Sequence, residues 1–111
     1  MITISSTRPG APQQIRVDGD LDLPQGDDLE RRVRPLLVPG AKVAIDLRDV
    51  PFADSSGIGA LLVLNQLAQD EGAELVLLDP SPVVRSVLQL TATIDLFTIA
   101  GPTAISHRRA S

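Results

Sequence analysis

Two patterns of apolar residues alternate along this chain and divide it into short and long segments. The short segments alternate apolar with polar residues, or are wholly apolar, and predict β-strands. The long segments place apolar residues three or four positions apart and predict helices. Strands are expected at 2–4, 15–18, 43–47, 74–78 and 94–99.

Three helices are expected between these strands. The first begins near Pro24, because the missing N–H of proline costs nothing in a first helical turn. Pro35 should kink or end that helix, since proline clashes with the preceding turn. The second covers about 55–70, and the third begins at Pro82 with Ser81 as its N-cap. The predicted order is β-β-α-β-α-β-α-β.

The connections between these elements predict the topology. A turn rich in proline and glycine at 8–12 separates the first two strands, which favours an antiparallel hairpin. The later strands are separated by helices, which favours parallel neighbours joined by right-handed crossovers. We therefore expect an α/β fold with a mixed sheet of about five strands and helices packed on it. The length of 111 residues fits a single domain spanning 1–111.

The strand-to-helix junction before the second helix holds the most distinctive residues. Asp54, Ser55 and Ser56 are all good N-caps, so the helix is expected to begin at Ser55 or Ser56. Gly57 and Gly59 follow in the first turn, although glycine costs about 1 kcal/mol relative to alanine inside a helix. Something is therefore expected to approach the backbone there. A helix start also favours a negative group, so a serine at this point can carry a phosphate.

Composition excludes several classes of function. The formal net charge is −4, which argues against nucleic acid as a partner. The chain has no cysteine and one histidine, so we expect neither disulfides nor a metal site. No signal-peptide pattern follows Met1, and the longest apolar run is too short for a membrane span. We expect a cytoplasmic protein with no cofactor and no membrane contact, and a monomer when free.

Four segments together resemble the STAS domain of bacterial anti-sigma factor antagonists. The first is Phe-Ala-Asp-Ser-Ser-Gly-Ile-Gly at 52–59, between a buried strand and an apolar helix. The others are Gly-Asp-Leu-Asp at 19–22, the Ser-Pro helix start within 79–88, and Leu-Phe-Thr-Ile at 96–99. The resemblance covers about 15–99 and implies the STAS fold.

The resemblance also implies a function. In that family the serine directly after the aspartate, here Ser55, is phosphorylated by the anti-sigma factor, a serine kinase of the histidine-kinase-like ATPase type. The unphosphorylated protein binds this kinase, and the sigma factor is released. The phosphorylated form dissociates from the kinase, and a serine phosphatase restores the unphosphorylated form. This chain would then be a substrate and switch, and not an enzyme.

A partner surface can be predicted around the same junction. A helical projection at about 100° per residue places Ile58 and Leu62 on the polar side of the helix, which predicts an exposed apolar spot for the kinase. Asp20 and Asp22 end a strand that is expected to neighbour the junction, as partner contacts or as a turn and helix cap. The expected partner-binding residues are Asp20, Asp22, Asp54, Ser55, Ser56, Gly57, Ile58, Gly59 and Leu62.

Other readings of the same residues are weaker. The segment 57–62, Gly-Ile-Gly-Ala-Leu-Leu, partly matches a dinucleotide fingerprint, but Leu62 replaces the third glycine. The strand at 43–47 also ends too many residues before Gly57, whereas the fingerprint follows its strand directly. A serine hydrolase would need a histidine, and the only one, His107, lies in an unpatterned tail. The alternative within the resemblance is a STAS interaction subunit of a lipid-transport ABC system or of a stress-signalling complex.

Overall fold

The computed structural model describes residues 1–5 and 12–101. The strands are β1 (Ile2–Ser5), β2 (Gln13–Val17), β3 (Lys42–Asp46), β4 (Glu74–Leu78) and β5 (Thr98–Ala100). The helices are α1 (Leu23–Val33), α2 (Ser55–Glu71) and α3 (Pro82–Leu90), with short 3₁₀ turns η1 (Arg34–Leu36) and η2 (Ile94–Leu96).

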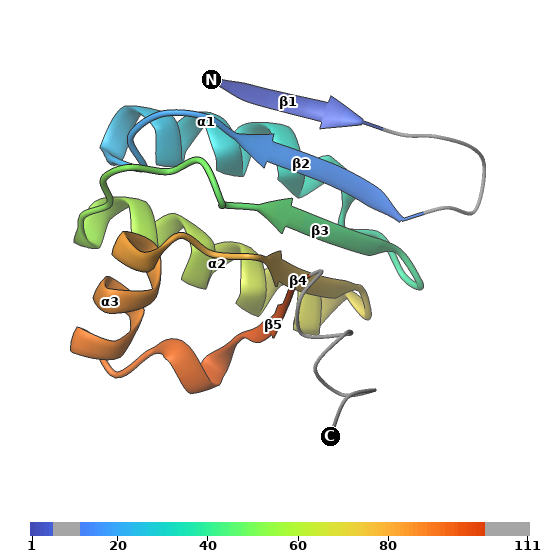
Figure 1. The fold of residues 1–111 in the computed structure, drawn as a ribbon. Coiled ribbons are helices and arrows are strands. Elements are labelled where there is room, and N and C mark those ends of the chain that lie inside the picture. The colour runs from blue at the N-terminus through green and yellow to red at the C-terminus, as the bar shows by residue number, and fades with distance from the viewer. Residues whose placement is uncertain (6–11, 102–111) are drawn as a thin grey trace, which may run out of the picture.

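The strands form one mixed sheet in the order β1-β2-β3-β4-β5 (Figure 1). β1 pairs antiparallel with β2, and β2 to β5 are parallel to one another. The predicted five-stranded sheet with an N-terminal hairpin is therefore confirmed. Of the predicted turn at 8–12, only Pro12 lies within the described residues, and the tail with His107 lies outside them.

One expected strand is shorter than the pattern suggested. The segment 94–99 was expected to be a strand, but Ile94–Leu96 forms the 3₁₀ turn η2 and only Thr98–Ala100 pairs with β4. Apolar residues at 94 and 96 are compatible with alternation and also with a single tight turn, so a short run does not separate the two.

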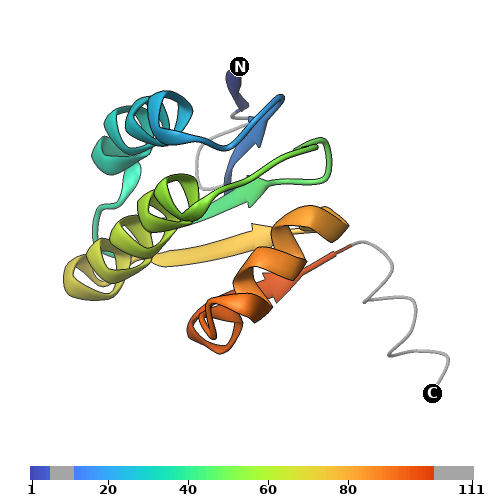
Figure 2. The same cartoon turned by 90° about the vertical axis from the view of Figure 1, so that its left-hand side faces the viewer.

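The helices and one face of the sheet enclose a single aliphatic core. α1 and α2 lie side by side, and α3 packs beside α2 (Figure 2). In the central strands Val43, Ile45, Leu75 and Leu77 point into this core, while the residues between them are more exposed. The parallel crossovers place α2 in the middle of the helical layer, with a helix on each of its flanks.

Proline acts on α1 as predicted. The helix ends at Val33, and the chain continues through Pro35 as the 3₁₀ turn η1. None of the helices in the described ranges has the length and apolar content needed to cross a membrane.

Candidate functional site

The loop between β3 and α2 ends in a well-formed helix cap. Asp54 has an extended backbone, and its side chain accepts a hydrogen bond from the Gly57 N–H at 3.0 Å. Its carbonyl accepts from the N–H of Ile58, also at 3.0 Å. Asp54 is therefore the N-cap, and α2 begins at Ser55, the earlier of the two predicted starts.

The two serines of the junction occupy the first two positions of α2, and both are exposed. Asp54 beside them is partly buried. A hydroxyl group on Ser55 thus stands at the solvent-facing amino end of a 17-residue helix. Modification of Ser55 requires this exposure, because a transferring enzyme has to reach the oxygen.

The two glycines of the first turn have different surroundings. A Cβ atom at Gly57 would lie 2.0 Å from the carbonyl oxygen of Leu21, so the backbone before α1 occupies that space. A Cβ atom at Gly59 would meet nothing within 4 Å. The expected close approach at Gly57 therefore comes from this chain itself. It leaves no room there for the pyrophosphate that a dinucleotide fingerprint would hold.

The loop between β2 and α1 lies against the junction, as predicted. Leu21 forms an isolated parallel bridge with Ala53, and it donates to the Phe52 carbonyl at 2.8 Å. Asp20 beside it is exposed, whereas Asp22 is the N-cap of α1 and accepts from the Gln25 N–H at 3.2 Å. The structure thus brings Asp20 next to the junction and gives Asp22 a capping role.

The predicted exposed spot of Ile58 and Leu62 is wrong. Ile58 is 2% exposed and belongs to the core, and Leu62 is partly buried against the core. A helical projection separates apolar from polar positions but does not include the neighbouring helices, and here α3 also packs against α2. Asn65, two turns beyond Ile58 on the same flank, donates to the carbonyl of Leu96 just beyond α3 at 2.9 Å.

The exposed surface of α2 is its outer face, which points away from the sheet. It runs from Ser55 through partly buried Gly59 to Val63, which is 44% exposed, and on to the polar residues Gln66 and Asp70. Phe52, on the loop just before α2, is 50% exposed. Phe52 and Val63 were not among the predicted partner-binding residues, although an aromatic residue next to the capping motif was a usable signal.

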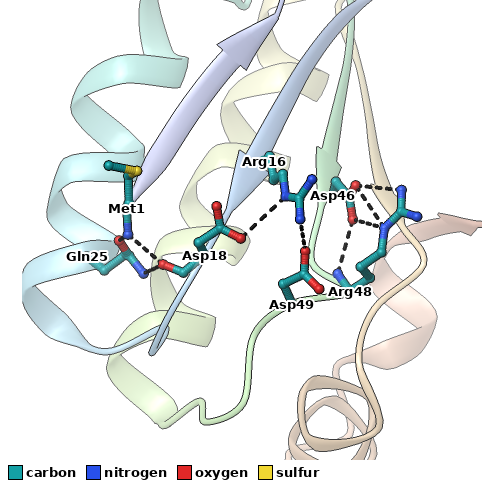
Figure 3. Close-up of polar contacts among 7 residues, drawn as sticks. All are labelled: Met1, Arg16, Asp18, Gln25, Asp46, Arg48 and Asp49. Carbon is teal, nitrogen blue, oxygen red and sulfur yellow. Dashed lines mark hydrogen bonds and ion pairs between the residues drawn. The ribbon is translucent and has the colours of Figure 1, made fainter.

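A network of charged groups at the carboxyl end of β3 was also missed (Figure 3). The buried carboxylate of Asp46 accepts from the Arg48 backbone N–H at 3.1 Å and from its guanidinium at 2.8 to 3.2 Å. Arg16 of β2 binds Asp49 of the loop and lies 3.3 Å from Asp18. These pairs tie the start of the loop to β2 and β3.

The pKa of Asp46 reflects these contacts. Burial alone would raise it, but the hydrogen bonds from Arg48 and the positive charges of Arg48 and Arg16 outweigh burial and hold the pKa below its ordinary value of 3.8. Asp46 is therefore a carboxylate at neutral pH, satisfied by its neighbours. Across residues 1–5 and 12–101, no group of three His, Cys, Asp or Glu side chains is placed to hold a metal ion.

The fold and this junction define a STAS domain. The family model for the STAS domain matches residues 5–105, and the chain belongs to that family. The chain is 29% identical over 99 residues to a STAS-domain containing protein of Pseudomonas aeruginosa (strain UCBPP-PA14), covering 89% of this chain and 98% of that protein.

Other similar proteins carry a more specific name. The anti-sigma-B factor antagonist of Bacillus subtilis (strain 168) is 26% identical over 87 residues, covering 78% of this chain and 80% of that protein. The solved structure of the anti-sigma factor antagonist SpoIIAA in its unphosphorylated form has a TM-score of 0.73 at 24% identity, covering 100% of this chain and 98% of the other. The family and fold inferred from the sequence are therefore confirmed.

Proposed function

We propose that this chain is an anti-sigma factor antagonist controlled by phosphorylation of Ser55. In its unphosphorylated form it binds an anti-sigma factor of the serine-kinase type, and the sigma factor is released. The phosphorylated form does not bind, and a serine phosphatase restores it. The surface around Ser55, including Asp20, Asp54, Ser56 and Gly59, contacts the kinase in this proposal.

The observation that carries the proposal is the exposed Ser55 hydroxyl at the first position of a helix whose cap is a neighbouring aspartate. The family of the chain supports it, since similar proteins are named anti-sigma factor antagonists. One of the similar folds, SpoIIAA, has been solved in a phosphorylated form, with a TM-score of 0.69.

A phosphate on Ser55 is compatible with the folded chain. It adds about −1.5 to −2 charges, and the free N–H groups of the first helical turn favour a negative group there. Inside a closed interface the same charge loses its water and repels other acidic groups. A penalty of about 3–5 kcal/mol weakens binding by two to four orders of magnitude.

The central test is phosphotransfer followed by mass measurement. Incubation with an anti-sigma factor kinase from the same genome and ATP should add the mass of one phosphate to the wild-type chain. Ser55→Ala should gain no phosphate, because its acceptor oxygen is gone.

Ser56→Ala is the matched control, since it removes the adjacent exposed hydroxyl and leaves the Asp54 cap in place. It should still accept one phosphate. Transfer to Ser56 in place of Ser55 would contradict the assignment. No transfer, with recovery of the chain in a complex with transporter subunits, would replace the sigma switch with the transport role.

A further inference from the structure

The loop that presents Ser55 is held from both sides by its neighbours. On the α1 side, Leu21 donates to the Phe52 carbonyl at 2.8 Å and accepts from the Asp54 N–H at 3.3 Å. On the α3 side, one residue, Ser81, makes two hydrogen bonds to the loop. Its backbone N–H donates to the Leu47 carbonyl at 3.2 Å, and its hydroxyl donates to the Val50 carbonyl at 2.7 Å.

The hydroxyl of Ser81 therefore has two separate roles. It accepts from the Val84 N–H at 3.3 Å, which caps α3, and it donates its own proton to Val50. The first role belongs to α3 alone and was expected from the sequence. The second joins the β4–α3 connection to the loop five residues before Ser55. Both residues are buried, at 7% exposure for Ser81 and 1% for Val50, so water does not readily replace this bond.

We propose that Ser81 is a positioning residue for the phosphoacceptor, acting through the Val50 carbonyl. This inference rests on the proposed phosphorylation of Ser55. Without the hydroxyl donor, the α3 side of the loop loses its side-chain anchor. The conformation that the kinase binds is then populated for only part of the time, and the apparent affinity falls by that fraction.

The two roles of the hydroxyl are separable by substitution. Ser81→Asp retains a good N-cap acceptor for α3, but an ionised carboxylate has no proton for Val50. Ser81→Ala removes both roles, and Ser81→Thr retains both. Thr91→Ala is the matched control, since Thr91 donates to the Val87 carbonyl at 2.8 Å at the opposite end of α3, away from the loop.

The first measurement is amide hydrogen exchange in the isolated chain. Exchange at Asp54, relative to the slowest amides of the core, should increase about tenfold in Ser81→Ala and Ser81→Asp, the factor expected from the loss of one buried hydrogen bond. Ser81→Thr and Thr91→Ala should resemble the wild type. Equal exchange in Ser81→Asp and the wild type overturns the proposal, because the donated bond then does not hold the loop.

The second measurement is phosphotransfer with the anti-sigma factor kinase and ATP. For Ser81→Ala and Ser81→Asp, KM should rise about tenfold while kcat stays within about twofold, because the bound kinase itself holds the loop. Ser81→Thr should restore the wild-type KM. An unchanged KM in Ser81→Asp, with normal transfer to Ser55, overturns the positioning role and leaves the proposed function intact. Failure of the wild-type chain to accept phosphate instead overturns the proposed function, while the exchange data still decide the loop contact.

Discussion

At the scale of single residues, the two glycines of α2 show how the same amino acid meets different constraints. Gly57 is required because the Leu21 carbonyl occupies the position of its missing side chain. Gly59 has open space at that position, so nothing in the described part of the chain requires it. The cost of placing a glycine inside the helix is therefore not offset by packing at this position. The proposed contact with the kinase would account for a residue without a side chain there.

Alanine at the two positions should have opposite effects on stability. Gly57→Ala should destabilise the fold by about 3 kcal/mol or more, because the backbone of Leu21 has to move away from the new methyl group. Gly59→Ala should stabilise it by up to about 1 kcal/mol through helix propensity. Urea denaturation of the two variants tests this, and a loss of stability in Gly59→Ala would contradict the open space at that residue.

Under the proposed function, Gly59→Ala should also weaken binding to the kinase. A stabilised variant with normal affinity for the kinase would show that the partner does not use the space above Gly59.

At the scale of elements, α2 is buried on more than one side. α1 covers one flank through the close approach of Gly26 to Ala60, and the segment after α3 covers the other through Asn65. The helix therefore exposes only its outer face, which includes Ser55 and Val63, and Ile58 lies outside that face.

Truncation of Ile58 and of Val63 to alanine should distinguish the buried side of α2 from its exposed side. Ile58→Ala should lower the free energy of unfolding by about 2–4 kcal/mol, because it leaves a cavity in the core. Val63→Ala should change it by less than about 0.5 kcal/mol, since Val63 is 44% exposed. Chemical denaturation measures both, and similar losses in the two variants would contradict the burial pattern. A charged residue at position 58 would be buried without a partner and would destabilise the fold, so it is unsuited to a binding test.

At the scale of the whole molecule, the carboxyl end of the sheet brings separate segments together. Arg16 and Asp46 are partners in the register of β2 and β3, and their ion pairs reach the following loop through Arg48 and Asp49. With Leu21 on one side and Ser81 on the other, two strand-to-helix connections flank the loop that leads to Ser55. The loop is therefore held in place by the tertiary structure.

Acidic pH should lower the free energy of unfolding because it protonates Asp46. Its pKa is below the ordinary value of 3.8 in the folded chain, so the unfolded chain binds the proton more readily. The stabilising effect is complete above about pH 5 and is lost as the pH falls below about 4 toward the folded pKa. Asp46→Asn should cost about 1 kcal/mol of unfolding free energy at pH 7, through its weaker hydrogen bonds to Arg48.

The prediction is tested by measuring the urea midpoints of the wild type and of Asp46→Asn between about pH 3 and about pH 7. The difference between the two should be constant near neutrality and should shrink in acid. A difference that stays constant down to about pH 3 would show that Asp46 does not carry the expected linkage.

The sequence by itself determined the features that depend on neighbouring residues along the chain. The pattern of apolar residues located the first four strands, proline ended α1 before Pro35, and the capping residues Asp54 and Ser81 marked two helix starts. Caps, turns and periodicity act over three or four residues, so a single sequence contains them in full. The order of strands and helices was sufficient for the mixed sheet, because crossovers constrain topology.

Only the tertiary structure decided which side chains of α2 are covered and what lies against each glycine. Ile58 is buried, Gly57 meets Leu21, and Ser81 reaches Val50 because segments far apart in the chain are packed together. The periodicity of a helix defines its faces, but it does not say how many neighbours the helix will have. Burial depends on that number, and it is set by the assembly of the whole sheet and its helices.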